Sequence, residues 1–239
     1  MMKMHLKLYT TLRRIKAEVY KKCFPRLYQE NLSRWERISH DYKCIFIHIP
    51  KTGGNSITMA LNKLPKKNNT PERSTPSIGK HAKARNVKRA LGNDVWEEYF
   101  SFALVRNPWD LMVSSYHWWL QKAYKWEHTH TDIKEIERMG SFDNFMHSKY
   151  GQEQINEYEG ALFDWISEND EVIVDFVGRF ENFQKDWNKI CEHIGVVPTT
   201  IPHANKTQRK NYREYYTPET KQIVHERFKK VIDLYGYEF

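Results

Sequence analysis

The stretch CIFIHIPKTGGNSI, residues 44–57, decides the fold. Its first half is apolar and rich in β-branched and aromatic residues, which is typical of a buried strand. Pro50 ends this strand, because proline has no N–H to donate to a neighbouring strand. Gly53 and Gly54 then allow the backbone to turn sharply, and the polar residues after them favour the start of a helix. The stretch therefore predicts a strand, a tight turn and a helix.

This strand, turn and helix together predict an anion-binding site. Lys51 follows the strand, and the free N–H groups and positive dipole end of the helix lie at the same place. The P-loop pattern is G-x-x-x-x-G-K-[ST], whereas Lys51 precedes both glycines. The turn is thus P-loop-like without being Walker A, and the alternative is an ordinary turn with a solvated lysine. The residues expected to line the site are Lys51, Thr52, Gly53, Gly54, Asn55 and Ser56.

A second segment has the same arrangement. The apolar run Phe100–Val105 predicts another strand, and Arg106 follows it directly. An arginine can bind a phosphate through two N–H groups at once. Pro108 favours the first turn of a helix, which places Ser114 two turns further along. Arg106 and Ser114 are therefore candidates for a second anion contact.

The two segments together resemble the donor-binding motifs of sulfotransferases that use 3′-phosphoadenosine 5′-phosphosulfate (PAPS). The resemblance is to the carbohydrate sulfotransferase-like group of the family 2 type, which includes bacterial homologues, and it runs from about residue 44 to the C-terminus. It implies a PAPS-dependent sulfotransferase with a P-loop-like, three-layer α/β fold, in which helices flank a central parallel sheet. Four further segments carry it, namely Lys80–Arg85, Val174–Asn182, His203–Asn205 and Tyr235–Phe239.

The resemblance also assigns roles at the donor site. It implies that Lys51 stabilises the leaving phosphate, while the N–H groups of residues 52–56 hold the 5′-phosphate, with the threonine and serine hydroxyls of that range as additional donors. Arg106 and Ser114 would hold the 3′-phosphate. The product would be adenosine 3′,5′-bisphosphate, and no metal is required.

His81 is the candidate general base for the acceptor hydroxyl, because a neutral imidazole titrates near working pH. It also matches the family's histidine ahead of an alanine-rich helix. Lys80, Lys83 and Arg85 would lower its pKa and attract an anionic acceptor, so Lys80 and Arg85 are candidate acceptor contacts. The alternative is that His81 only begins a surface helix. His48 is a weaker rival, because its place in the first strand predicts that it points into the sheet.

Three features allow two interpretations each. Arg209 lies where related enzymes fold a basic loop over the nucleotide, so it is expected to contact the 3′-phosphate or the adenine, but a solvated charge run is an equal alternative. The aromatic residues of segment 118–138 either stack on a sugar or cover a core edge. His128, His130 and Asp132 have a metal-ligand spacing, yet no fourth ligand is evident and we expect no metal.

The remaining segments predict how the sheet is completed. Strands that alternate with helices indicate a parallel sheet whose carboxyl edge binds the ligand. Arg179 and Glu181 are expected to form a structural pair beneath that edge. The other expected elements are a loop at 63–80, a helix at 82–91 that stops at Gly92, a third parallel strand at 172–177, a helix at 183–194 ended by Gly195, and a C-terminal helix at 218–234.

Length and composition favour one catalytic domain. The 239 residues are enough for one sizeable α/β core, which we expect at 41–239 after a basic, helical arm at 1–40. No apolar run of about eighteen residues is present. The three cysteines form no C-x-x-C pair, which argues against a disulfide framework and a zinc site. We therefore expect a cytoplasmic enzyme of bacterial type.

The net charge of +8 is concentrated in the arm, where residues 1–40 contain ten Lys or Arg and three Asp or Glu. Leu8, Leu12, Ile15 and Val19 follow a helical spacing between these basic residues. Such a helix either packs on the domain or lies on anionic lipid at the inner membrane surface. The second interpretation suits an acceptor hydroxyl on a saccharide or glycolipid. The sequence does not indicate the oligomeric state.

Two other classes of function remain as alternatives. A small-molecule kinase with a variant phosphate loop would need Mg²⁺, but no acidic strand end near Lys51 is evident, and Ser56 is not adjacent to that lysine. A nucleic-acid-binding module without catalysis would explain the pI of about 9.2 but not the two anion motifs. We therefore expect no nucleic-acid partner.

Overall fold

The computed structural model describes residues 37–65, 67, 78–121, 123–125, 130–154, 162–201 and 207–239. Three of the expected segments lie outside these residues: nearly all of the basic arm, most of the loop at 63–80, and the His203–Asn205 segment. Within the described ranges, no helix has both the length and the apolar character needed to cross a bilayer.

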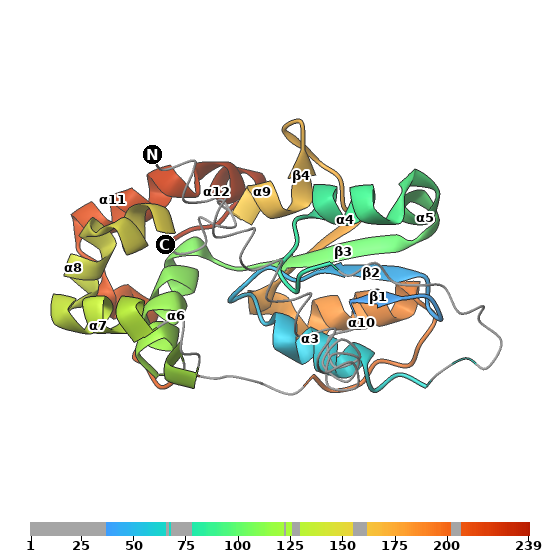
Figure 1. Cartoon of the computed structure of the whole chain (residues 1–239), viewed down its shortest axis with the longest axis horizontal. Coiled ribbons are helices and arrows are strands. Elements are labelled where there is room, and N and C mark those ends of the chain that lie inside the picture. Colours follow the sequence, from blue (N-terminus) through green and yellow to red (C-terminus); the bar gives the residue numbers. More distant parts are fainter. Residues whose placement is uncertain are drawn as a thin grey trace, which may run out of the picture. The chain divides into compact units, whose positions relative to one another are not determined.

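A four-stranded sheet organises the domain (Figure 1). Its strands are β1 (Ile38–Ser39), β2 (Cys44–Ile47), β3 (Phe100–Val105) and β6 (Phe176–Arg179), in the order β1-β2-β3-β6. β2, β3 and β6 are parallel, whereas β1 runs antiparallel to β2. The sheet thus begins with Ile38–Ser39, which we expected to belong to the arm at 1–40. Parallel pairing of β2 and β3 brings the two predicted anion segments to the same edge.

The expected third strand at 172–177 is wrong in its limits. Residues Glu171–Val172 form β5, which pairs antiparallel with β4 (Ser167–Glu168) in a separate hairpin. Asn169 and Asp170 connect the two with φ angles of 50° and 63°, and such left-handed residues are typical of a tight hairpin turn. The third parallel strand is therefore β6, which begins only at Phe176 and ends at Arg179.

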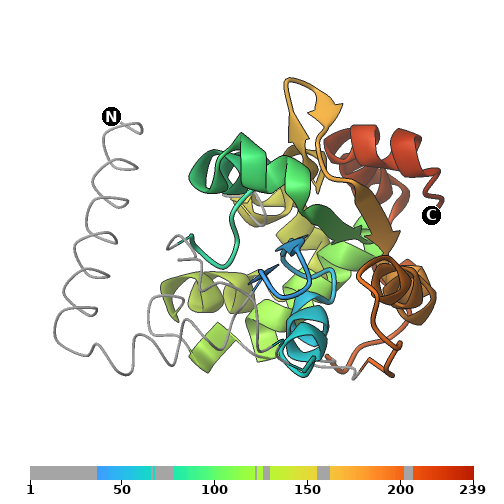
Figure 2. The same ribbon diagram turned by 90° about the vertical axis from the view of Figure 1, so that its right-hand side faces the viewer.

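Side chains alternate along β2 and β3 and build a core on each face of the sheet. Phe46 and Phe102 pack on one face with α3 (Gly54–Leu61) and α10 (Phe183–His193). Ile47 and Ala103 pack on the other face with helices that include α4 (Ala84–Leu91), α6 (Pro108–Gln121) and α12 (Lys229–Tyr235). Figure 2 shows α3 and α10 on one side of the sheet and α4 and α5 (Asn93–Glu98) on the other. The predicted three-layer α/β class is confirmed.

The helices agree with the sequence at most positions. Gly92 and Gly195 follow the ends of α4 and α10, as expected. The expected C-terminal helix at 218–234 is instead two helices, because Phe228 leaves the helical conformation. The helices are α3 (Gly54–Leu61), α4 (Ala84–Leu91), α5 (Asn93–Glu98), α6 (Pro108–Gln121), α7 (His130–Met139), α8 (Phe142–His147), α9 (Leu162–Ile166), α10 (Phe183–His193), α11 (Pro218–Arg227) and α12 (Lys229–Tyr235), with short turns of helix at Ala123–Lys125, Tyr150–Gln154, Phe180–Asn182 and Tyr212–Tyr215.

The carboxylate of Glu181 ties the C-terminal segment to the start of α6. Its Oε1 accepts the backbone N–H of Asn107 (2.7 Å), and its Oε2 accepts the Tyr237 hydroxyl (3.2 Å). Arg179 instead donates to the carbonyl of Tyr235. Arg179 and Glu181 therefore do not pair with each other as expected, and both hold the C-terminal segment against the sheet.

Asp186 joins α10 to β6. Asp186 is 4% exposed, its side chain accepts the backbone N–H of Arg179 (2.8 Å), and it forms an ion pair with the exposed Lys189 (3.1 Å). Asp186→Ala leaves a buried N–H without a partner, so we expect it to lower the free energy of unfolding by about 1–3 kcal/mol in urea denaturation. The control Lys189→Ala removes only an exposed partner and should cost less than about 1 kcal/mol. Equal losses in both variants would contradict this role of Asp186.

Candidate active site

The turn between β2 and α3 contains two residues in the left-handed region. Lys51 has φ 68° and Gly53 has φ 87°. A left-handed lysine costs about 1–2 kcal/mol, and such strain is concentrated at functional sites. The Thr52 hydroxyl donates to the carbonyl of Ile49 (2.9 Å), and the Ser56 N–H donates to the carbonyl of Gly53 (2.9 Å). These two groups are thus used within the turn and are not directed at an anion as expected.

The imidazole of His48 lies directly under Gly54. A Cβ atom on Gly54 would stand 2.1 Å from Cδ2 and 2.2 Å from Nε2 of His48. The ring is buried, stacks on Phe46 and meets the ring of His81 edge-on, with centroids 4.8 Å apart. Glycine is therefore required at position 54 to make room for His48, which connects the turn to His81.

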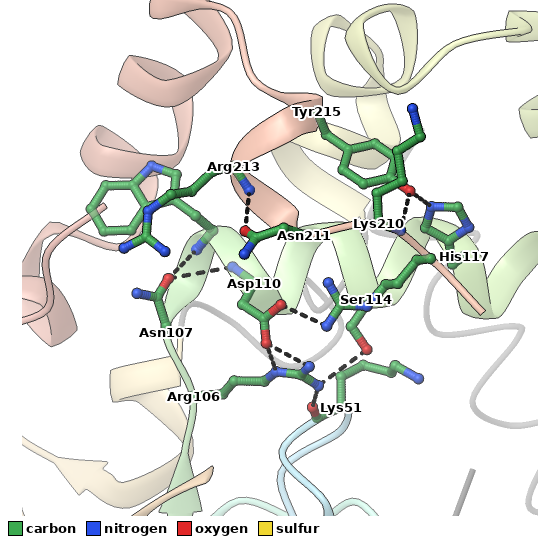
Figure 3. Close-up of polar contacts among 12 residues, drawn as sticks. Lys51, Arg106, Asn107, Asp110, Ser114, His117, Lys210, Asn211, Arg213 and Tyr215 are labelled. Atoms are coloured by element: carbon green, nitrogen blue, oxygen red, sulfur yellow. Dashed lines mark hydrogen bonds and ion pairs between the residues drawn. The ribbon is translucent and has the colours of Figure 1, made fainter. Parts of the chain in front are cut away.

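Arg106 joins the two anion segments. It is 6% exposed, and its Nη1 donates to the carbonyl of Lys51 (2.8 Å) and to the hydroxyl oxygen of Ser114 (3.1 Å). Its Nε and Nη2 contact Oδ2 of Asp110 at 2.8 and 2.6 Å. Figure 3 shows Arg106, Asp110 and Ser114 pointing toward one another, while Lys51 meets Arg106 through its carbonyl oxygen and its side chain extends away from this group. Most of the fork of Arg106 is thus engaged inside the protein, while Ser114 keeps its own hydroxyl hydrogen for another acceptor.

Arg209 reaches the same place from the segment before Tyr212–Tyr215. Its Nη2 forms an ion pair with Oδ1 of Asp110 (2.6 Å). Gln121 at the end of α6 fixes this segment, because it donates to the Gln208 carbonyl (2.8 Å) and accepts the Gln208 N–H (3.2 Å). Asp110 therefore holds Arg106 with one oxygen and Arg209 with the other.

The site has more positive than negative charge. Asp110 is shared by Arg106 and Arg209, and no carboxylate in the described part of the chain pairs with Lys51. The Lys51 ammonium lies over the ring of Trp118, 5.3 Å from its centroid. Burial, with repulsion from Arg106 and Arg209, lowers the pKa of Lys51 to about 7. An anion bound here would supply the missing negative charge.

His81 lies beside the turn in a form that suits a base. Its Nδ1 lies 3.1 Å from the carbonyl oxygen of His48, and a carbonyl only accepts, so Nδ1 carries the hydrogen and Nε2 keeps its lone pair. Part of His81 is open to solvent. Burial, followed by repulsion from Lys80 and Arg37, outweighs the hydrogen bond and lowers its pKa to about 4. His81 is therefore neutral at physiological pH.

Lys80 and Arg85, the two expected acceptor contacts, lie in different surroundings in the structure. Lys80 donates to the side-chain oxygen of Asn55 (2.8 Å), which links the His81 turn to the anion turn. Arg85 forms an ion pair with Asp164 in α9 (3.0 Å), and Lys83 contacts the same carboxylate. Arg85 is thus used in packing α4 against α9 and does not join the group around Lys51.

Sequence reasoning missed three residues of this region, Asp110, Gln121 and Arg37. The spacing of Arg106 and Asp110, four residues apart at a helix start, is a signal that could have found the first of them. Gln121 has no such signal, because its partner Gln208 lies far away in sequence. Arg37 fell outside the stretch that carries the resemblance.

The geometry of this sheet edge is typical of one class of protein. A parallel sheet that brings cationic residues from two strand ends to one edge is typical of a P-loop-like α/β protein that binds a phosphorylated ligand. A family model described as "Sulfotransferase family" matches residues 36–238, and the chain belongs to this family. The family assignment supports sulfuryl transfer as the activity.

An uncharacterized protein of Archaeoglobus fulgidus is 28% identical over 130 residues, which are 54% of this chain and 94% of that protein. No solved structure matches the chain.

The contact between Gly54 and His48 can be measured as a coupling energy. Gly54→Ala places a methyl group on a packed ring, so we expect a loss of about 1–3 kcal/mol in the free energy of unfolding. The double variant Gly54→Ala/His48→Ala should lose less than the sum of the single losses, by at least about 1 kcal/mol. Additive losses in urea denaturation would show that the two residues do not constrain each other.

Proposed function

We propose that this protein transfers a sulfuryl group from PAPS to an acceptor hydroxyl on a saccharide or glycolipid. The observation that carries the proposal is the half-buried Lys51, which has no carboxylate partner among the described residues and lies beside Arg106 and Arg209. Family membership supports a sulfated or phosphorylated nucleotide as the ligand that would balance this charge.

The residues at the turn fit the two phosphates of the proposed donor. Lys51 and the N–H groups of Gly54 and Asn55 at the start of α3 would hold the 5′-phosphate, because the first N–H groups of a helix have no acceptor within it and the N–H of Ser56 is already bonded to Gly53. The 3′-phosphate would be held by three groups: the Ser114 hydroxyl, the one Nη2 hydrogen of Arg106 that Asp110 does not use, and the guanidinium of Arg209. When bound, the donor supplies an activated sulfuryl group. In this proposal Lys51 donates a hydrogen bond to the leaving phosphate. The positive charge of Lys51 stabilises the negative charge that develops on that phosphate in the transition state.

His81 would act on the acceptor. Its Nε2 takes the proton of the acceptor hydroxyl, while the hydrogen bond from Nδ1 to the His48 carbonyl fixes the ring. The low pKa of His81 keeps this base unprotonated over the physiological range. Trp118 lies half-buried beside Lys51, where an aromatic face would suit a sugar ring.

The test of the base is turnover with labelled PAPS and a saccharide panel. His81→Ala should lower kcat by about 10²–10⁴-fold and leave the affinity for adenosine 3′,5′-bisphosphate unchanged. Because the base must be unprotonated and its pKa is about 4, the native enzyme should keep its activity as the pH falls from 7 to 5. An acidic limb near the ordinary histidine pKa, or normal turnover in the variant, would remove His81 from this role. His225→Ala on α11 is the matched control.

The pKa of Lys51 predicts a linked proton. At pH 8 the lysine of the free protein is mainly neutral, because its pKa is about 7, and a bound phosphate dianion should return its proton. Calorimetry with adenosine 3′,5′-bisphosphate in buffers of different ionisation enthalpy should therefore show uptake that approaches one proton at pH 8. Lys51→Met should abolish this uptake and weaken binding. Binding by the native chain without uptake at pH 8 would contradict the assignment.

A further inference from the structure

One face of α6 carries a stripe of polar side chains. The stripe follows helical spacing, with steps of four, three and four residues, and consists of Asp110, Ser114, His117 and Gln121. The first two contact the arginines of the proposed donor site, since Asp110 pairs with Arg209 and Ser114 accepts a hydrogen bond from Arg106. The last two contact the residues on either side of Arg209, directly or through Tyr215. The whole stripe is therefore connected to the proposed donor site.

Gln121 binds the backbone of Gln208, the residue before Arg209. Its Nε2 donates to the Gln208 carbonyl (2.8 Å), and its Oε1 accepts the Gln208 N–H (3.2 Å). The same Nε2 lies 3.3 Å from Nδ1 of His117, so its second hydrogen is donated to that nitrogen. A ring nitrogen that accepts a hydrogen bond carries a lone pair, and neutral His117 then has its hydrogen on Nε2. Gln121 thus fixes both the Gln208 backbone and the tautomer of His117.

Tyr215 binds the backbone of Lys210, the residue after Arg209. Its hydroxyl oxygen accepts the Lys210 N–H (3.1 Å) and lies 2.9 Å from Nε2 of His117, which donates its hydrogen to the same oxygen. Figure 3 shows the Tyr215 hydroxyl between His117 and Lys210. His117 therefore connects the contact before Arg209 with the contact after it. Hydrogen bonds among His117, Gln121 and Tyr215 hold the backbone on both sides of Arg209, and we call these three residues the Arg209 clamp.

The Arg209 clamp acts on a segment that is otherwise exposed. Gln208 and Lys210 are exposed, whereas the side chain of Arg209 is only 16% exposed and its Nη2 contacts Asp110. An arginine that is already ordered loses less conformational freedom when it binds a phosphate. Burial, followed by repulsion from Arg209, lowers the pKa of His117, which favours the neutral form that the clamp requires. The clamp and Asp110 together fix the backbone and the guanidinium of Arg209.

We propose that His117, Gln121 and Tyr215 are positioning residues that hold Arg209 for the 3′-phosphate of the donor nucleotide. The inference rests on the proposed function for the identity of the ligand. A prealigned guanidinium favours nucleotides that carry the 3′-phosphate, because a nucleotide with a free 3′-hydroxyl gains no ion pair from it. The clamp thus sets the preference for this class of nucleotide through the backbone of Arg209.

The test compares two nucleotides that differ only in the 3′-phosphate. Calorimetry measures binding of adenosine 3′,5′-bisphosphate and adenosine 5′-monophosphate to the full chain. Gln121→Ala should weaken the bisphosphate by about threefold to tenfold, which corresponds to the loss of a hydrogen bond, and leave the monophosphate unchanged. Tyr215→Phe, which keeps the aromatic ring and removes the acceptor of the Lys210 N–H, should have the same effect.

Gln184→Ala is the matched control. Gln184 on α10 also pairs with distant backbone, since it donates to the Thr199 carbonyl (3.1 Å) and accepts the Ile201 N–H (3.0 Å), but this backbone does not adjoin Arg209. Its loss should leave the affinity for both nucleotides unchanged.

A double variant distinguishes positioning from general stabilisation. Because Gln121 acts through Arg209, Gln121→Ala/Arg209→Ala should bind the bisphosphate within about twofold of Arg209→Ala alone. Hydrogen exchange without nucleotide gives a second readout. The Gln208 N–H should exchange faster in Gln121→Ala than in the native chain, and at the native rate in Gln184→Ala.

The outcomes separate the clamp from the donor site. The clamp would be overturned by native bisphosphate affinity in Gln121→Ala and Tyr215→Phe, by equal losses for both nucleotides, or by additive losses in the double variant. A native chain that does not bind the bisphosphate would instead overturn the donor site. Exchange of the Gln208 N–H would then still decide whether Gln121 fixes the segment, and native exchange in Gln121→Ala would overturn that.

Discussion

The hydrogen bond from the guanidinium of Arg106 to the carbonyl of Lys51 is the interaction on which the site depends. It joins residues that are 55 positions apart, and it exists because β2 and β3 are parallel neighbours whose carboxyl ends meet. The turn around Lys51 is left-handed and strained, so an external contact is needed to hold its carbonyl in place. Arg106 supplies that contact while Asp110 holds Arg106.

The charges of the site follow from this arrangement. Asp110 uses one carboxylate to neutralise two arginines, which leaves Lys51 without a partner among the described residues. The cost of desolvating Lys51 appears as its lowered pKa. Arg37, at the amino end of β1, is a second buried cation without a carboxylate partner in the described part of the chain.

Local sequence patterns predicted the fold well where one segment contains the whole signal. The strand at 100–105, the helix from Pro108 and the turn at Gly53 are confirmed because apolar runs, proline and glycine act through nearby backbone. The third strand was misplaced, because its apolar run is divided between a hairpin and β6, and only pairing with β3 distinguishes them. The break at Phe228 likewise has no strong local signal.

The site was predictable in its cations but not in their partners. The structure brings Lys51, Arg106, Ser114 and Arg209 close together, and their role in binding the donor stays a prediction. Two contacts join residues that are far apart in sequence or on different elements, so no local pattern contains them. One is the ion pair of Arg85 with Asp164, and the other is the packing of His48 into the space left by Gly54.

Whether the cations around Lys51 bind the donor can be decided by calorimetric titration of the chain with adenosine 3′,5′-bisphosphate in the presence of a chelator, beside a titration with ATP and Mg²⁺. The account predicts micromolar binding of the bisphosphate without metal, and at least tenfold weaker binding of adenosine 5′-monophosphate, which lacks the 3′-phosphate. Binding of ATP and Mg²⁺ alone would contradict the account in favour of a kinase, and binding of neither nucleotide would show that the cations around Lys51 do not form a donor site.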